Sequence, residues 1–256
     1  MTKTESYPAR QLRRRRNAWM HRNLRIVVLL VVGTLVLGAF VSVLLQTIPM
    51  PIRLYLLGVT HAGIIAAGLH MLNSAFLAHD QQAVWQMRGA WGEDNTRSEL
   101  QRAKRKRHIW GWVDSVELQA GDIDHIVVTR RGGVVIIDSK WRSQITREDV
   151  PAMADSARRA ALRAEGVLRT LLKRENGARH RTRAQPVSVT AAVVLWGAAR
   201  TAVPSDANVD GVRFLDGRQL LDWLAQLDGH EVPRDAANDV LKLLTDYRSA
   251  VVTTTK

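Results

Sequence analysis

The chain has 256 residues, 46% of them hydrophobic, which suffices for one compact domain of ordinary size and an appended segment. It contains no cysteine, which excludes a disulfide framework and a thiolate metal site. The formal net charge is +13, but residues 1–25 alone hold eight Lys and Arg against one Glu. More than half of the excess charge therefore lies in a short N-terminal tail, and the charge alone is weak evidence for nucleic-acid binding.

A first hydrophobic segment follows this basic tail. Residues 26–45 are twenty residues without a charge, and a helix of this length spans roughly 30 Å, the thickness of a bilayer's hydrocarbon core. A signal peptide would have a shorter apolar region of about 7–15 residues and a small-x-small cleavage site, which is absent after residue 45. We therefore predict that residues 26–45 cross a membrane.

A second, less apolar segment at residues 54–77 is predicted to cross back. It includes His61, His70 and two further polar side chains, which we expect to face the partner helix or an interface rather than lipid. Pro49 and Pro51 suit a tight turn between the two segments, and glycines in both allow the helices to approach closely. The two segments thus predict a transmembrane helical hairpin.

The arginines set the predicted topology. Seven of them precede the first span, whereas the turn carries only Arg53, so the N-terminus is expected to stay in the cytoplasm. Two crossings return the rest of the chain to that side, which makes both termini of this two-span cell-membrane protein cytoplasmic. Without the second crossing, the domain that follows the spans would lie outside the cell. The predicted parts are a basic tail at 1–25, the spans within 26–77, a linker helix at 78–91, an α/β domain at 92–230, and a C-terminal helix and tail at 231–256.

The region after the spans alternates between helical and strand patterns. A helix is predicted over 92–107, because Glu93 and Asp94 lie at its start and four basic residues at its end, as the helix dipole favours. Gly132 and Gly133 indicate a hairpin turn between two apolar runs. The predicted strands are 109–118, 122–129, 134–140, 187–197 and 212–215, and the further helices 150–175, 217–227 and 234–249. This order predicts an α/β fold of α+β type, with a mixed sheet flanked by helices.

Strand alternation brings charged side chains together. Asp138 and Lys140 are two residues apart and therefore lie on one face of their strand. If the hairpin turn is centred on Arg131, Asp124 lies directly opposite Asp138, whereas a two-residue loop would break that pairing. Two adjacent carboxylates repel each other unless a divalent cation or the lysine compensates, and Mg²⁺ is the natural candidate.

An acid on one strand and Asp-x-Lys on the next is the layout of the restriction-endonuclease-like PD-(D/E)xK superfamily. The run from Gly92-Glu93 through residues 121–128 to residues 133–140 resembles the nuclease-related domain family (NERD), a predicted-nuclease branch of that superfamily that often accompanies membrane spans. The resemblance covers roughly residues 88–200 and is strongest over 121–141. Relatives usually carry Glu-x-Lys where this chain has Asp138-Ser139-Lys140, and no convincing glutamine occurs in the following helix.

The resemblance implies a role for each residue of the cluster. Asp124 and Asp138 would bind Mg²⁺ or Mn²⁺ together with the carbonyl of Ser139. Lys140 would orient or deprotonate the attacking water, and Glu93 would complete the acidic group. The implied reaction is metal-assisted hydrolysis of phosphodiester bonds in DNA or RNA.

The residues alone leave a second interpretation open. Asp138 and Lys140 can form an ion pair at a strand end, in which case the chain is a non-catalytic module that binds nucleic acid or a protein partner at the membrane. His125 neighbours Asp124 but points to the opposite face of the strand, so we expect it to pack or to form a hydrogen bond.

Basic and aromatic side chains flank the predicted cluster. They are candidates for nucleic-acid binding, although a solvated helix end or attraction to anionic lipid explains the basic ones as well. Trp110, Trp112 and Trp141 could stack on bases or pack in the core. The candidates are Arg102, Lys104, Arg105, Lys106, Arg107 and Trp141, with a second basic group at Lys173, Arg174, Arg179, Arg181 and Arg183.

Overall fold

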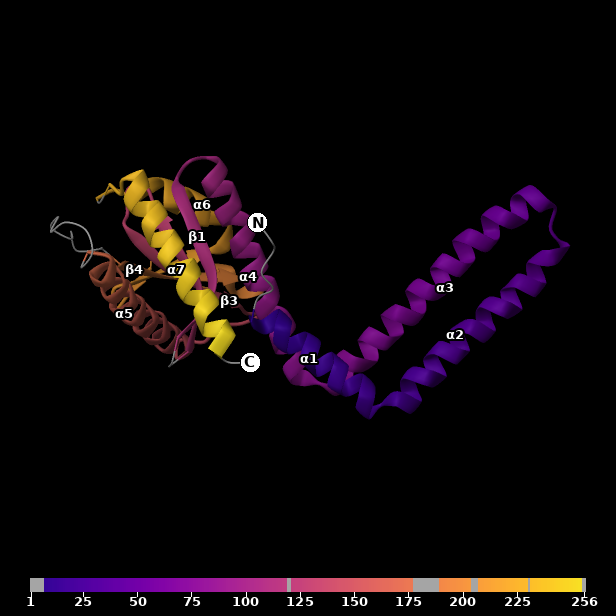
Figure 1. Ribbon diagram of the computed structural model, residues 1–256. Helices are drawn as coiled ribbons and strands as arrows, with labels where there is room; N and C mark the ends of the chain where they lie inside the picture. The colour runs from indigo at the N-terminus through magenta and orange to yellow at the C-terminus, as the bar shows by residue number, and fades with distance from the viewer. Residues whose placement is uncertain (1–6, 119–120, 177–188, 204–206, 230, 255–256) are drawn as a thin grey trace. The chain divides into compact units, whose positions relative to one another are not determined.

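The computed structural model describes residues 7–118, 121–176, 189–203, 207–229 and 231–254 (Figure 1). The chain divides into two compact units, Pro8–Met87 and Arg88–Lys256.

The first unit is helical. Its helices are α1 (Tyr7–Arg22), α2 (Leu24–Leu44), the 3₁₀ turn η1 (Leu45–Thr47) and α3 (Met50–His79). The segments Leu24–Thr47 and Met50–His79 are each long and apolar enough to cross a membrane, and most of their large hydrophobic side chains are exposed. Helix α2 begins two residues before the predicted span and ends one residue before its predicted end, whereas α3 extends beyond the predicted span at both ends; η1 with Pro49 forms the predicted turn between them.

Small residues allow α2 and α3 to touch at two points. Gly38 lies against His61, whose Nε2 is 3.1 Å from the hydroxyl of Ser42. Gly68 lies against Thr34 of α2. The expectation that His61 packs against the partner helix is therefore confirmed. The remaining glycines of the two helices have nothing within 4 Å of a Cβ and therefore do not mediate further close approach.

Helix α4 (Gln81–Arg105) is longer than predicted. The separate helix start at residue 92 was wrong, because the helix begins after Asp80, whose Oδ1 accepts a 3.0 Å hydrogen bond from the backbone N–H of Ala83. Asp80 is therefore the N-cap of one continuous helix. Glu93 and Asp94 consequently lie in the middle of α4 and not at its positive end.

The second unit is built on a mixed sheet, as expected, but the sheet has six strands where five were predicted. The strands are β1 (Ile109–Leu118), β2 (Gly121–Thr129), β3 (Val134–Trp141), β4 (Val189–Trp196), β5 (Asn208–Val209) and β6 (Val212–Asp216). Their order is β1-β2-β3-β4-β6-β5, with β3, β4 and β6 parallel and the other neighbours antiparallel. Of the predicted strand 187–197, the first two residues lie outside the described part of the chain.

The β2–β3 hairpin has the register that the candidate site requires. His125 pairs with Ile137 and Ile126 with Ile136, which confirms the alignment centred on Arg131. The turn closes where the backbone N–H of Thr129 donates to the carbonyl of Gly133 at 3.0 Å. Gly133 has a φ of +70°, the conformation for which glycine was expected there.

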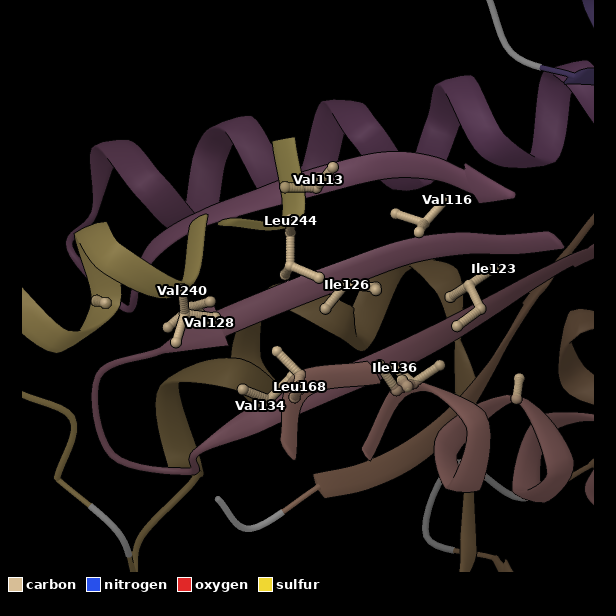
Figure 2. Close-up of a cluster of buried hydrophobic side chains, with 13 residues drawn as sticks. Val113, Val116, Ile123, Ile126, Val128, Val134, Ile136, Leu168, Val240 and Leu244 are labelled. Atoms are coloured by element: carbon tan, nitrogen blue, oxygen red, sulfur yellow. The ribbon is translucent and has the colours of Figure 1, made fainter. Parts of the chain in front are cut away.

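Helices cover both faces of the sheet. The long crossover helix α5 (Asp149–Asn176) and the C-terminal helix α7 (Arg234–Thr254) pack on one face. Figure 2 shows Leu168 of α5 and Val240 and Leu244 of α7 close to the apolar side chains of β1, β2 and β3. On the other face α4 and the short helix α6 (Leu220–Gln226) bury Leu100 and Leu224 against the strands. The core therefore lies on both sides of β2, β3 and β4.

Candidate functional site

The predicted site residues lie at one end of β2 and β3. Asp124 directly precedes the first ladder pair of the hairpin, and Asp138 directly follows that pair on β3. On its other side β3 pairs with β4, where Asp138 lies beside Val193 and Lys140 beside Leu195. The hairpin thus places the two carboxylates at matching positions, and the parallel pairing keeps the end of β3 inside the sheet.

Direct contacts hold three of these residues together. The ammonium Nζ of Lys140 lies 2.6 Å from Oδ1 of Asp138. Oδ2 of Asp124 accepts a 2.7 Å hydrogen bond from the backbone N–H of Ser139. The hydroxyl of Ser139 donates to Thr96 of α4 at 2.8 Å, which turns that side chain away from the cluster and ties β3 to the helix.

Helix α4 brings the fourth residue, Glu93, to the same place. A Cβ on Gly92 would lie 3.4 Å from the backbone nitrogen of Trp141, so α4 packs directly on the end of β3 at this glycine. Glu93 follows it and is 5% exposed. Its charge interacts with that of Asp124, which in turn interacts with the charges of Asp138 and Lys140.

The crowding of carboxylates changes their pKa values. Burial and the nearby charge of Asp124 raise the pKa of Glu93 to about 9. Burial and the charge of Asp138 raise the pKa of Asp124 to about 6, against the opposing effect of Lys140. Burial alone would lower the pKa of Lys140, but Asp138 and Asp124 raise it above its ordinary value. At neutral pH Glu93 is therefore protonated and Lys140 charged.

The donor set fits a hard divalent cation held by few ligands. Oε2 of Glu93 and Oδ2 of Asp138 are buried without a hydrogen-bond partner in the described part of the chain. Buried polar atoms without a partner are costly unless a water or a ligand meets them. No three Asp, Glu or His side chains among the described residues are grouped closely enough to hold a metal ion. Mg²⁺, however, needs just one or two carboxylates and keeps several waters, so this arrangement is compatible with it.

A buried network next to the cluster was not predicted as a unit. His125 has no exposed surface, and its Nδ1 lies 2.7 Å from Oδ1 of Asp114 on β1. Oδ2 of Asp114 accepts a 2.9 Å hydrogen bond from Nε of Arg97, which also pairs with Asp94 at 2.5 Å. The expectation of a hydrogen-bonding His125 is confirmed. Its partner on another strand could not be named without the β1–β2 register.

Two further residues beside the site were missed. The Trp141 ring meets Trp91 of α4 edge-on, with 6.2 Å between ring centroids, and the guanidinium of Arg88 lies 5.1 Å from the centre of the Trp141 ring. Trp91 is 48% exposed. These three side chains form a cationic and aromatic surface at the end of β3. A helix predicted from residue 81 onward would have placed Arg88 and Trp91, three residues apart, on one helix face.

The basic candidates lie away from the carboxylates. Arg102 is nine residues beyond Glu93 on α4, about 14 Å along the helix axis. It forms a surface ion pair with Glu99, while Lys104 lies 6.0 Å from the ring of Trp112. The second basic group is not described in this respect: the side chains of residues 173 and 174 and all of residues 179, 181 and 183 lie outside what the structure describes.

Comparison with known proteins supports the resemblance over part of the chain. Residues 88–194 match the model of the nuclease-related domain family, NERD. No curated protein and no solved structure matches the chain. The chain therefore contains a nuclease-related domain that includes most of α4, all of β1, β2, β3 and α5, and nearly all of β4.

Proposed function

We propose that this protein is a membrane-anchored, metal-dependent nuclease that hydrolyses phosphodiester bonds in nucleic acid on the cytoplasmic side. One observation carries the proposal: Asp124, Asp138 and Lys140 lie at the end of β2 and β3, and the charge of Glu93 interacts with that of Asp124, inside the region that matches the nuclease-related domain. Metal-assisted hydrolysis needs hard oxygen ligands next to a group that can hold water, and this cluster contains both.

Each residue has a distinct task in this proposal. Asp124 and Asp138 hold Mg²⁺ or Mn²⁺ together with the carbonyl oxygen of Ser139, and the cation supplies a nucleophilic water and neutralises phosphate charge. The bond from the Ser139 N–H fixes Asp124, which leaves its other oxygen for the ligand. Lys140 lies against Asp138, where its ammonium orients the water and the scissile phosphate. Glu93 completes the group of acidic residues.

The surface of Arg88, Trp91 and Trp141 offers a place for the nucleic acid beside these residues. An exposed indole stacks on any base, and a guanidinium pairs with a phosphate, so neither contact requires a particular sequence. Farther along α4, the basic residues 102–107 would follow the phosphate backbone. The proposed substrate is therefore single-stranded or locally opened nucleic acid without sequence preference.

The test is cleavage by the full chain, purified in detergent micelles and supplied with Mg²⁺ or Mn²⁺. Labelled single-stranded DNA and RNA serve as substrates. We expect cleavage to fall by at least about 100-fold in Asp138→Asn and Lys140→Met, because each removes a group that contacts the reacting centre. Asp155→Asn, which changes a carboxylate on α5, serves as the matched control. Equal cleavage by the wild type and by all three variants would contradict the proposal.

One feature favours the alternative, a non-catalytic module that binds nucleic acid or a protein partner at the membrane. Asp138 is already paired with Lys140, as in a structural ion pair at a strand end. This alternative expects nucleic-acid binding without turnover, and it expects that binding to survive Asp124→Asn and Asp138→Asn unchanged. A filter-binding measurement on the same preparations distinguishes the two functions.

The membrane location is also part of the proposal. Two helices long and apolar enough to cross a bilayer, the first preceded by six arginines, support an anchor with both termini in the cytoplasm. The nuclease-related domain would then lie where nucleic acid is present.

A further inference from the structure

A cavity of about 350 Å³ opens at the other end of the sheet from the carboxylate cluster. It lies between the start of β1, the end of β2, the end of α6 and the segment that leads into α7. Its lining combines basic, aromatic and aliphatic side chains with one acid. The principal lining residues are Arg107, Trp110, Arg130, Arg131, Leu227 and Glu231.

The cavity is separate from the candidate active site. Arg130 follows β2 six residues after Asp124, and an extended strand of that length spans about 20 Å. A ligand in this cavity would therefore contact neither Asp138 nor Lys140.

The charge of the cavity is strongly one-sided. In the described part of the chain, none of Arg107, Arg130 and Arg131 forms an ion pair. Nε of Arg130 is buried and has no hydrogen-bond partner there. Glu231 is the single acid of the lining. Three guanidinium groups around one cavity, one of them with a buried and unpartnered Nε, give this cavity the charge and donor groups that bind an anion.

Arg130 is held in place before any ligand arrives. Its guanidinium lies 3.9 Å from the ring centre of Trp110, a close cation–π contact. The indole N–H of Trp110 donates to the carbonyl of Val232 at 2.8 Å, and the N–H of Val232 donates to the carbonyl of Arg130 at 2.9 Å. These bonds fix the arginine, the ring and the opposite wall relative to one another, so a ligand would order few side chains on binding.

The backbone of Arg107 gives independent support. It has a φ of +64° at the end of α4, where His108 and Arg107 donate backbone N–H bonds to Ala103 and Lys104. Glycine usually occupies this position of a helix C-terminus, because a side chain is strained there. The chain instead places a cavity-lining arginine at this site, where its charge serves the cavity.

We propose that this cavity binds the polyphosphate chain of a nucleotide, a nucleoside di- or triphosphate. Three guanidinium groups match two or three phosphates, since each guanidinium can form a bidentate bond to phosphate oxygens. The aliphatic wall that includes Leu227 can cover the nucleoside. A volume of about 350 Å³ is large enough for part of a nucleotide and too large for one inorganic phosphate to fill.

The test is isothermal titration calorimetry on the full chain in detergent micelles, with ATP as the probe and EDTA present so that no divalent cation links ATP to the carboxylates. Adenosine, inorganic phosphate and glycerol 3-phosphate are titrated in parallel. We expect ATP to bind at least about tenfold more tightly than inorganic phosphate or glycerol 3-phosphate, and adenosine not to bind. Equal affinity for ATP and inorganic phosphate, preferential binding of glycerol 3-phosphate, or no binding of ATP would each overturn the assignment.

Variants test whether ATP binds in this cavity and whether the positive charge of the cavity attracts it. Arg130→Gln and Arg131→Gln should each weaken ATP binding about tenfold or more, whereas Glu231→Gln should strengthen it. Arg131 is exposed in the hairpin turn, so its replacement tests the cavity even if Arg130→Gln does not fold. Arg102→Gln, on α4 but outside the cavity, should bind like wild type. Unchanged affinity in Arg131→Gln would contradict the proposal, and that result would leave the cleavage proposal untouched.

Discussion

At the scale of single residues, Glu93 connects the stability of the domain to pH. Its pKa is raised from 4.5 to about 9, so the folded chain keeps a proton that the unfolded chain has lost between these values. Folding therefore takes up a proton in this range. The contribution of Glu93 to the free energy of unfolding is complete below about pH 4.5 and is lost as the pH rises through about 9. Glu93→Gln cannot titrate and should lose this part of the decline.

This prediction is measured as the thermal midpoint of the full chain in micelles, followed by circular dichroism in EDTA from pH 5 to pH 9. Glu165→Gln, a carboxylate on the surface of α5 that pairs with Arg169, is the control and should keep the wild-type slope. A Glu93→Gln profile that falls as steeply as wild type would show that Glu93 does not carry the proton.

The Arg97 network gives a second prediction. Arg97→Met leaves Asp114 without its guanidinium partner, which is itself only 8% exposed, whereas Arg102 is 58% exposed. Breaking one side of a buried pair costs about 3 kcal/mol or more, whereas a surface pair contributes at most about 1 kcal/mol. Urea unfolding followed by tryptophan fluorescence should therefore show a large loss for Arg97→Met and a small one for Arg102→Met, which removes the surface pair with Glu99. Similar losses in both variants would contradict the role of burial.

Spacing alone predicted part of the cluster. Asp138 and Lys140 share a face because strand side chains alternate, and the glycine turn placed Asp124 opposite Asp138. The Arg97–Asp114–His125 network could not be predicted in this way. It joins a helix and two strands whose contacts depend on packing that no local pattern encodes.

At the scale of elements, two glycines should respond oppositely to the same substitution. A Cβ on Gly217 would overlap the ring of Trp196, whose indole N–H bonds to Thr96. Gly217→Ala should therefore destabilise the domain by about 1–3 kcal/mol, as overpacking does. A Cβ on Gly166 of α5 meets nothing within 4 Å, so Gly166→Ala should stabilise by roughly 1 kcal/mol. The midpoint of urea unfolding measures both, and a stabilised Gly217→Ala would refute the packing argument.

Element prediction succeeded where periodicity was strong. Ala160, Ala164 and Leu168 recur at helical spacing in the predicted helix 150–175 and form the buried face of α5. The start of α4 was misplaced because acidic residues were taken as a helix start, while the actual cap, Asp80, lies directly after an apolar helix. Strand β5 was missed because it is two residues long, although Asp210 and Gly211, with φ of +51° and +79°, form the kind of turn that joins such short hairpins.

At the scale of the whole molecule, the absence of cysteine allows a clean test of topology. Gln46→Cys places a thiol in the turn between α2 and α3, and Asp239→Cys places one on α7. A membrane-impermeant maleimide applied to intact cells should label the first and spare the second, and permeabilised cells should label both. Labelling of Asp239→Cys in intact cells would contradict a cytoplasmic domain.

The sequence predicted a mixed sheet but not the order of its strands. Hairpin partners are neighbours in the chain, so β2 and β3 were paired from local signals. The parallel neighbours β3 and β4 are separated by α5, and β6 lies beside β4 with β5 outside it. Such long-range pairings are set by the packing of α5 and α6 on the two faces, which a single sequence does not reveal.

The short turn between β2 and β3 makes chain length, rather than side-chain chemistry, the constraint on this part of the domain. Loops elsewhere on a surface tolerate inserted residues at small cost. Here one residue deleted or inserted between Thr129 and Val134 would shift the register by one and move Asp138 and Lys140 out of line with Asp124. This protein should therefore keep its fold after many substitutions at Arg130 and Arg131. It should not tolerate the insertion or deletion of a single residue in this turn.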